Sequence, residues 1–352
     1  MTTKANYFNC FVILILFAGL FAACAPTNRV LNYTHQFKGQ SVNGAHARGI
    51  SANNQYIVIS GKDGNIGVHL FDTTMGGAHI QDVIENIEDF RDIHLDEKGN
   101  CFLMNTGEKA IIFGIAGGSR RAILFDTAGV FLDGMAFWNR NAGIVFGDPV
   151  NGKFYLANMT NGGDDWKTMS PNTMPAALEN EAGYAASGTS IQTIGDSTVY
   201  FGTGMGAKAR LFCSYDRGAN WIVKDTPMKA GDSYGIYSMF FWSENEGMIC
   251  GGSYKDSTYK KGICQYTADG GDTWQEKSRG LDGYISCVQG TADGEFIVAT
   301  GRMGTFYTTN KGQSWDVLID RPFYSCFVND KIVVLTGRNG ATEIIHYSIS
   351  NK

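Results

Sequence analysis

Proline is scarce in this sequence, at 6 of 352 residues. Disordered linkers are usually rich in proline, so its scarcity argues against several domains joined by long linkers. Neither sign of charge is in large excess, because 29 Lys and Arg residues stand against 34 Asp and Glu residues. The resulting net charge of −5 excludes nucleic-acid binding by bulk positive charge, and any basic surface has to be local.

Recognisable motifs for catalysis, metals or cofactors are also missing. The six His residues show no zinc-ligand spacing with a second pair, and no Ser, His and Asp follow a nucleophile-elbow motif. The segment Gly202-x-Gly204-x-x-Ala207 matches a degenerate dinucleotide fingerprint, but residues 210–213 after it predict a strand. Because that fingerprint needs a helix N-terminus to hold the pyrophosphate, we expect no dehydrogenase, no cofactor and no metal.

The apolar run at the N-terminus, residues 10–23, is too short to span a bilayer comfortably at 14 residues. Lys4 is the only charge before it, and the run ends in small residues, which predicts a signal peptide over residues 1–23. Its Ala-Ala-Cys ending resembles a bacterial lipobox, in which Cys24 is acylated and begins a short tether over residues 24–29. Phe21 stands where Leu is usual, so ordinary cleavage and an uncleaved anchor are the alternatives. We expect a lipid-anchored protein of the bacterial cell envelope, in the periplasm or at the outer membrane.

Cysteine occurs eight times but in no Cys-x-x-Cys pair. Six cysteines lie beyond Cys24, and an even number in an exported protein permits disulfides. Several of them sit inside apolar runs, which favours buried free thiols that pack as small hydrophobic side chains. Cys250 and Cys264 form the one pair that we would test for a bridge.

Glycine, by contrast, is abundant at 45 residues, and part of it belongs to a repeated motif. Four segments share Ser/Thr-x-Asp/Asn-x-Gly-x-x-Trp, with Met159 breaking the hydroxyl position of the first. The acidic or amide residue can accept hydrogen bonds within its own turn, the glycine permits a positive φ, and the tryptophan buries a large ring. We therefore expect a structural role for Asn161, Gly163, Trp166, Asp216, Gly218, Trp221, Asp269, Gly271, Trp274, Asn310, Gly312 and Trp315.

The spacing of the four tryptophans gives the length of the repeat. Consecutive copies lie 55, 53 and 41 residues apart. A degraded copy over residues 73–80 lies 86 residues before Trp166, or two repeats, so a blade without a motif is expected over residues 90–124. After Trp315 only 37 residues remain, enough for three strands. A strand over residues 30–37 is therefore expected to supply the outer strand of the last repeat.

Short apolar segments recur at the start of the repeats and before a glycine, as in strands that are buried on both faces. The starts are residues 47–50, 90–93, 132–135, 236–239, 284–287 and 324–327. The sequence therefore predicts an all-β fold, namely a seven-bladed β-propeller with four-stranded antiparallel blades over residues 30–352. Closure of the ring would leave only short, protected strand edges.

These features resemble the Asp-box (BNR) propellers related to photosystem II stability/assembly factors, especially the bacterial lipoproteins of that group. The resemblance rests on the four motifs, here called Asp-boxes, and on residues 90–93, 131–138, 143–149 and 185–191. It implies a noncatalytic binding or assembly factor, and it does not imply photosynthesis here. We expect a monomeric propeller that recognises a protein or glycan partner and no nucleic acid.

The candidate binding face follows from strand direction. If the strands of each blade are named A to D from inner to outer, the D–A connections and B–C turns share one face, and the Asp-box C–D turns lie on the other. Arg and Tyr on the first face suit an anionic partner, whereas ordinary solvated turns are the alternative interpretation. The candidates are Arg48, Lys62, Arg91, Asp92, Asp133, Asp148, Glu181, Lys208, Tyr254, Tyr284, Arg302, Tyr324 and Arg338.

A sialidase-like glycoside hydrolase is the alternative function, since such enzymes also use Asp-box propellers. The segment Arg48-Gly49-Ile50 lacks the Pro of their Arg-Ile-Pro segment, and no Tyr–Glu nucleophile pair is recognisable. A binding protein predicts that Arg91, Arg302 and Arg338 converge without a close carboxylate pair. An enzyme predicts a deep pocket with two carboxyl groups about 5 to 9 Å apart.

Overall fold

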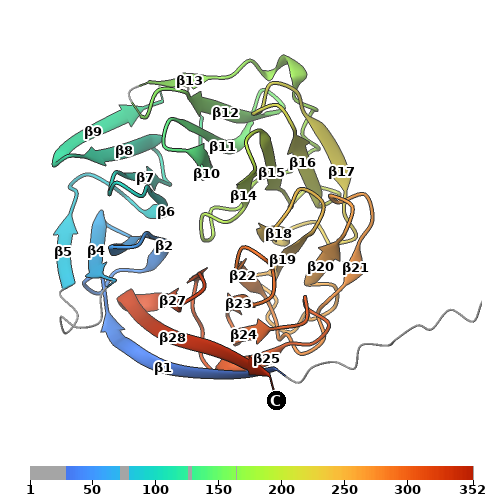
Figure 1. Cartoon of the computed structure of the whole chain (residues 1–352). Helices are drawn as coiled ribbons and strands as arrows, with labels where there is room; N and C mark the ends of the chain where they lie inside the picture. The colour runs from blue at the N-terminus through green and yellow to red at the C-terminus, as the bar shows by residue number, and fades with distance from the viewer. Residues whose placement is uncertain (1–28, 72–78, 126–128, 164, 352) are drawn as a thin grey trace, which may run out of the picture.

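Seven four-stranded antiparallel sheets surround a central axis in the computed structural model of the chain (Figure 1). The structure describes residues 29–71, 79–125, 129–163 and 165–351. The predicted seven-bladed β-propeller is confirmed. The proposed signal peptide, Cys24 and most of the degraded motif over residues 73–80 lie outside the described residues. In the described part of the chain, no helix is long and apolar enough to cross a membrane.

Each blade runs from an inner strand A to an outer strand D. Blades 1 and 2 are β2 (Ala47–Ala52), β3 (Tyr56–Gly61), β4 (Asn65–Leu70) and β5 (His79–Val83), then β6 (Phe90–Leu95), β7 (Cys101–Asn105), β8 (Ile111–Ala116) and β9 (Ser119–Leu124). Blades 3 and 4 are β10 (Leu132–Asn139), β11 (Ala142–Val150), β12 (Lys153–Met159) and β13 (Trp166–Thr168), then β14 (Ile191–Ile194), β15 (Thr198–Gly202), β16 (Arg210–Ser214) and β17 (Ile222–Asp225). The blade expected over residues 90–124 is therefore blade 2.

The other three blades follow in chain order. Blades 5 and 6 are β18 (Tyr234–Phe241), β19 (Gly247–Ser253), β20 (Cys264–Thr267) and β21 (Gln275–Glu276), then β22 (Ile285–Gly290), β23 (Ile297–Gly301), β24 (Gly304–Thr308) and β25 (Asp316–Ile319). Blade 7 is β26 (Ser325–Val328), β27 (Ile332–Thr336), β28 (Ala341–Asn351) and β1 (Arg29–Gln40). Two single turns of 3-10 helix, Pro171–Thr173 and Arg338–Gly340, lie between strands.

Blade 7 joins the two ends of the chain. Strand β1 pairs antiparallel with β28 from Arg29 opposite Asn351 to Gln40 opposite Ala341, with one irregularity between His35 and Phe37. The two strands lie side by side along the outer edge of the ring (Figure 1). The expected outer strand over residues 30–37 is confirmed and extends further at both ends. This pairing supplies the fourth strand of blade 7 and joins the N-terminal strand to the C-terminal one by backbone hydrogen bonds.

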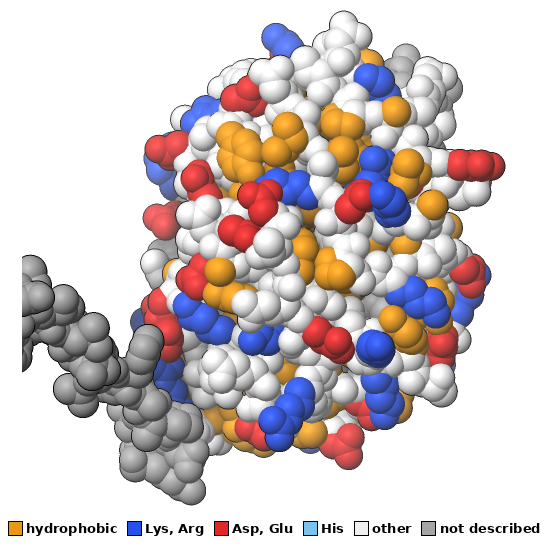
Figure 2. All heavy atoms as spheres, turned by 90° about the vertical axis from the view of Figure 1, so that its right-hand side faces the viewer, with side chains coloured by type: hydrophobic (Ala, Val, Ile, Leu, Met, Phe, Trp, Pro, Cys, Tyr) orange, Lys and Arg blue, Asp and Glu red, His pale blue; other side chains and the backbone are white. Residues whose placement is uncertain are grey.

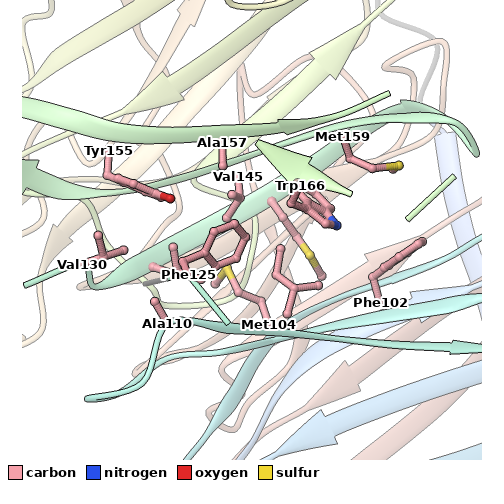
Figure 3. Close-up of a cluster of buried hydrophobic side chains, with 13 residues drawn as sticks. Phe102, Met104, Ala110, Phe125, Val130, Val145, Tyr155, Ala157, Met159 and Trp166 are labelled. Carbon is pink, nitrogen blue, oxygen red and sulfur yellow. The ribbon is translucent and has the colours of Figure 1, made fainter. Parts of the chain in front are cut away.

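The hydrophobic core is divided into layers between neighbouring blades rather than gathered at one centre. Figure 3 shows the layer between blades 2 and 3, where Phe102 and Met104 of β7 face Val145 of β11 and Trp166 of β13. The rings of Phe102 and Trp166 meet edge to face, with centroids 6.5 Å apart. Each blade therefore buries its apolar faces only against its two neighbours, and the ring has to be complete for all layers to exist.

The Asp-boxes fix the C–D turns as the motif chemistry predicts. In blade 4, Asp216 Oδ1 accepts from the Asn220 N–H at 2.8 Å, and the Ser214 hydroxyl accepts from the Gly218 N–H at 2.8 Å. Gly218 has φ +85°, and Trp221 Nε1 donates to its carbonyl at 2.8 Å. The two turn bonds recur around Asp269 and Asn310. Trp274 Nε1 likewise donates to the Gly271 carbonyl, whereas Trp315 Nε1 donates to the Lys277 carbonyl. Side-chain and backbone hydrogen bonds from Thr273 lower the pKa of Asp269 to about 2, so its carboxylate is kept ionised as an acceptor.

The Asp-box of blade 3 is the incomplete one. Met159 cannot make the hydroxyl bonds of the other copies, and Asn161 Oδ1 accepts from the Asp165 N–H at 3.1 Å. Among the described residues, which exclude residue 164, Trp166 Nε1 has no hydrogen-bond partner although the ring is buried. The position where the sequence departs from the motif is thus the position where the turn loses contacts.

The expectation of buried free thiols is correct for Cys101, Cys213, Cys287 and Cys326, and the one pair singled out for a bridge, Cys250 and Cys264, forms a disulfide. These two cysteines face each other directly in β19 and β20, with Cα atoms 4.2 Å apart. Their apolar surroundings suggested free thiols, but the register of two neighbouring strands decides which cysteines meet.

We predict that Trp221→Ala lowers the free energy of unfolding by about 3–5 kcal/mol, the usual cost of removing a large buried aromatic ring. Trp221 is 6% exposed and packs on Phe201 with centroids 5.1 Å apart. Urea unfolding followed by intrinsic fluorescence measures the change. The adjacent Ile222 is 50% exposed, so Ile222→Ala is the matched control and should change stability by less than about 0.5 kcal/mol. Equal effects of the two substitutions would contradict a structural role for the Asp-box tryptophan.

Candidate functional site

A pocket of about 620 Å³ opens at the centre of the face formed by the D–A connections and B–C turns, here called the pocket face. Seven of the predicted residues line it, and they come from blades 1, 2, 5, 6 and 7 and the connections between them. They are Arg48, Arg91, Tyr254, Tyr284, Arg302, Tyr324 and Arg338. The other lining residues are Tyr184, Ala185, Ala186, Tyr237, Ser286, Pro322 and Phe323.

Bulges in the inner strands bring side chains to this pocket. In five blades one residue near the start of strand A has no partner in strand B. A bulge of this kind twists the strand locally and redirects the side chain of the unpaired residue. The unpaired residues are Arg48, Arg91, Asp133, Tyr237 and Ser286, and all but Asp133 line the pocket.

Residues 182–190, which precede β14 and are here called the plug, contribute Tyr184, Ala185 and Ala186 to the pocket lining. This segment reaches toward the centre of the ring beside β14 (Figure 1). Its carbonyls at Ala185 and Ala186 accept hydrogen bonds from Arg91 at 3.2 Å and Arg48 at 3.3 Å. On the other side, Ser187 Oγ donates to the Ser286 carbonyl at 2.9 Å. The plug therefore contacts blades 1, 2 and 6 and orients both inner arginines.

Glu181 anchors the plug and does not line the pocket. It is 3% exposed and accepts from Arg210 Nε at 2.9 Å and from the Thr203 hydroxyl at 2.5 Å. Its second oxygen accepts from the Leu178 N–H at 2.8 Å. A buried carboxylate with this many partners is a structural element, so its expected place on the binding face is not supported.

The four lining arginines are only partly neutralised. Arg91 Nε donates to Asp89 at 2.8 Å, and Arg302 donates to the Tyr254 carbonyl at 2.7 Å. Arg338 is exposed and makes no side-chain hydrogen bond within the described part of the chain. Among the described lining residues there is no Asp or Glu. The pocket therefore carries a net positive charge although the whole chain is acidic.

Arg48 is the most constrained of the four. Its guanidinium stacks on the Tyr324 ring, with Cζ 4.3 Å from the centroid, and its buried Nε has no partner among the described residues. Burial lowers the pKa of Arg48, and the charge of Arg91 lowers it further. Because an arginine stays protonated even so, an anion placed beside Arg48 and Arg91 would relieve both the lost hydration and the repulsion.

Three tyrosines form an aromatic wall, and the hydroxyl groups of two of them have hydrogen-bond partners. Tyr184 and Tyr237 stack with centroids 3.7 Å apart, and Tyr284 meets Tyr237 edge to face at 4.7 Å. The Tyr184 and Tyr237 hydroxyls donate to the carbonyls of Tyr234 at 3.0 Å and Ser233 at 2.6 Å. Burial raises the pKa of all three tyrosines, so they remain neutral. Their rings are rigid contact surface rather than acids or nucleophiles.

The three predicted aspartates lie outside the pocket. Asp92 is buried and accepts from the N–H groups of Ile93 and Met135, both at 2.7 Å, and so joins blade 2 to blade 3. Burial raises the pKa of Asp92 to about 8. Asp133 lies directly under Gly183, where an added Cβ would come within 2.5 Å of Oδ2. Burial, and then the neighbouring Asp148, raise the pKa of Asp133 well above its usual value.

Asp148 and the two predicted lysines also serve other contacts. Asp148 Oδ1 accepts from the Gly183 N–H at 3.0 Å, beneath the plug. Lys208 pairs with Asp225, and Lys62 lies 4.0 Å from Asp63. Both lysines are on the pocket face but away from the pocket. No group of three His, Cys, Asp or Glu residues in the described part of the chain is arranged to hold a metal ion.

Several lining residues were not among the candidates, although the sequence carried a signal for two of them. Tyr237 and Ser286 occupy the same position of the aligned inner strands as Arg48 and Arg91. Neither side chain is charged, so charge did not mark them as site residues. The other missed lining residues, Tyr184, Ala185, Ala186, Pro322 and Phe323, come from irregular connections, for which the sequence offered no periodicity.

Comparison with known proteins shows the fold and no more. No family model matches the chain, and no curated protein matches it. The WD40 domain of Neurospora crassa Pan2 is similar in structure, with a TM-score of 0.63 over 89% of this chain and 95% of that one. The two share 12% sequence identity. The chain has the fold of a β-propeller. At this identity the likeness carries no shared ligand or partner.

We predict that Asp133→Asn flattens the fall of stability with rising pH. A buried carboxyl whose folded pKa is raised binds a proton that the unfolded chain has lost, so stability declines above about pH 4, by up to about 1.4 kcal/mol per pH unit for one group. Asn cannot ionise, so the variant should gain on the native protein between pH 5 and pH 8 in thermal unfolding. Asp63, exposed on the same face, gives the control Asp63→Asn. An unchanged pH profile for Asp133→Asn would show that this carboxyl is ionised when folded.

Proposed function

We propose that this protein is a noncatalytic binding protein that holds an anionic polypeptide segment in the central pocket. The observation that carries the proposal is the convergence of Arg48, Arg91, Arg302 and Arg338 in a pocket walled by tyrosines, with no acidic residue among the described lining residues. Guanidinium groups bind carboxylates through paired hydrogen bonds, and aromatic walls add contact area at low entropic cost. β-Propellers are common binding scaffolds, and the Asp-box assembly factors that the sequence resembles suggest the same class of function.

The position of the carboxyl groups argues against the hydrolase alternative. Glycoside hydrolysis by the usual route needs two carboxyl groups on either side of the scissile bond. The neighbouring acids Asp133 and Asp148 are covered by the plug at Gly183, and burial favours their protonated forms. A sugar in the pocket would meet arginines and tyrosines instead.

The rim of the pocket favours a polypeptide over a glycan. The B–C turns of blades 4, 5 and 6 present Met205, Tyr254 and Met303, which are 39%, 49% and 43% exposed. Arg338, which lines the pocket, occupies the corresponding turn of blade 7, and Lys62 occupies that of blade 1 outside the pocket. Methionine adapts to varied apolar side chains, and exposed apolar groups beside charged ones are typical of protein-binding surfaces. A peptide segment that carries a carboxylate next to an apolar side chain would match both the apolar turns and the basic turn of Arg338.

The side of the ring that Figure 2 shows has no comparable concentration of one charge among the described residues. Figure 2 shows the wall on the right-hand side of Figure 1, where Lys and Arg are interspersed with Asp and Glu. Several of these charges pair with each other, as Lys224 does with Asp272 at 2.8 Å. A surface of mixed charge of this kind supports solubility and needs no partner.

We also propose that the chain is exported and anchored by lipid at Cys24. The first described residue, Arg29, pairs with Asn351 at the end of β28 that is remote from the pocket face. Arg29 also forms an ion pair at 2.5 Å with Glu295, in the A–B turn of blade 6 on the Asp-box face. An anchor five residues before Arg29 would hold the Asp-box face toward the membrane and leave the pocket facing away.

Incorporation of labelled fatty acid that is lost in Cys24→Ala would support the anchor, and retention of the label would refute it.

We predict that Arg338→Glu and Arg302→Glu each weaken binding of acidic peptides about tenfold or more, because each replaces an attraction with a repulsion in the pocket. The probes are fluorescein-labelled peptides with Asp or Glu beside Leu or Phe, measured by fluorescence polarisation. Both arginines are exposed, so folding should be preserved. Lys208→Glu is the matched control, since Lys208 lies on the same face outside the pocket.

Two outcomes would overturn the proposal. Binding of sialylated or uronic-acid oligosaccharides in place of the peptides would show that the partner is a glycan. Release of the chromophore from a chromogenic sialoside, lost in Arg338→Glu, would show that the site is catalytic.

A further inference from the structure

Two cysteine thiols meet between the inner strands of blades 6 and 7. Cys287 lies in β22 and Cys326 in β26, and their sulfur atoms are 3.6 Å apart. They are 0% and 3% exposed. Although 39 residues separate them in sequence, ring geometry places them against each other. Ser286, just before Cys287, lines the pocket and donates through Oγ to the carbonyl of Tyr324, another lining residue, at 2.7 Å.

The surroundings of the two thiols differ. The Cys287 sulfur accepts from the Cys326 S–H and from the Thr189 hydroxyl, both at 3.6 Å. Burial disfavours the thiolate of Cys287, but these hydrogen bonds outweigh burial and lower its pKa to about 7. Burial raises the pKa of Cys326 well above the usual thiol range. Cys287 is therefore the more nucleophilic sulfur, with Cys326 in position to resolve it.

We propose that Cys287 and Cys326 form a second disulfide, which staples blade 6 to the closing blade 7, and that the structure shows the dithiol form. A disulfide needs sulfurs about 2.05 Å apart, so from 3.6 Å each sulfur has to move by about 0.8 Å. Side-chain rotation can supply such a shift without unpairing either strand. The proposal is independent of what the pocket binds.

The oxidant is a disulfide of the thiol–disulfide exchange class, as found where exported proteins fold. The Cys287 thiolate attacks one sulfur of that disulfide, forming a mixed disulfide and releasing one thiolate. Cys326 then loses its proton and attacks the Cys287 sulfur, which forms the Cys287–Cys326 bond and releases the second thiolate. The two cysteines lose two electrons and two protons, and the oxidant leaves as two thiols.

This bond would differ in effect from the disulfide of blade 5. Cys250 and Cys264 are 14 residues apart and join two strands of one blade, so they leave the contact between blades unchanged. A bond between Cys287 and Cys326 would join blade 6 to blade 7, and blade 7 contains both the N-terminal strand β1 and the C-terminal strand β28. A longer closed loop also restricts the unfolded chain more in the chain-entropy account of disulfides.

Differential alkylation of the full-length protein tests the proposal directly. Because both thiols are buried in the folded protein, samples are reduced and unfolded, refolded in a glutathione redox buffer or in dithiothreitol, then unfolded again, alkylated with iodoacetamide and mapped by mass spectrometry. We expect oxidation to remove alkylation at Cys287 and Cys326 and to yield a peptide cross-linked between them. Cys101 and Cys213, buried and without a thiol partner, are internal controls and should be alkylated in both samples. Full alkylation of Cys287 and Cys326 after oxidation would overturn the proposal.

A second measurement isolates the effect on the ring. In a Cys250→Ser/Cys264→Ser background, only the proposed bond can respond to oxidation among the described strands. We expect oxidation to raise the Tm of this variant by several degrees, and the further change Cys326→Ser to abolish the rise. A Tm that does not depend on oxidation in that background would show that the bond does not join the blades. If the variants do not fold, the alkylation map of the native chain still decides whether the bond forms.

Discussion

The pairing of β1 with β28 is the interaction on which the rest of the structure depends. Each blade buries its faces only against its neighbours, so an open ring would expose the layer that holds Ile57 of blade 1 and Val334 of blade 7. The pocket depends on the same closure, because Arg48 of blade 1 stacks on Tyr324 beside blade 7. A few residues at each end of the chain thus control both the stability of the core and the geometry of the site.

Convergence of the inner strands at the axis has opposite effects on acids and on arginines. Exclusion of water there favours the neutral form of a carboxyl group. Burial raises the pKa values of Asp92, which accepts two backbone hydrogen bonds, and of Asp133, which lies against Gly183 of the plug. A guanidinium cannot give up its proton within the ordinary pH range, so Arg48 and Arg91 keep their charge. The same burial therefore favours the neutral forms of Asp92 and Asp133 and leaves the pocket positively charged.

The sequence was sufficient for the fold because the Asp-box is a local device. Asp216, Gly218 and Trp221 determine their turn through contacts within eight residues, so the pattern alone located the outer turns and their spacing gave the blade count. The closing strand followed from counting what remained after Trp315. The site was predicted in part, since strand direction identified the pocket face and seven of its lining residues.

What the sequence by itself determined was therefore the propeller, the number of its blades, the face that carries the pocket and the positions of the Asp-boxes. Only the tertiary structure decided that Glu181 pairs with Arg210, that Tyr184 and Tyr237 form the aromatic wall, and that Cys287 meets Cys326. The physical reason is range. Turn and strand patterns are set by residues that are close in sequence. Contacts between different blades join residues that are far apart in sequence, and these residues come close in space only when the ring closes.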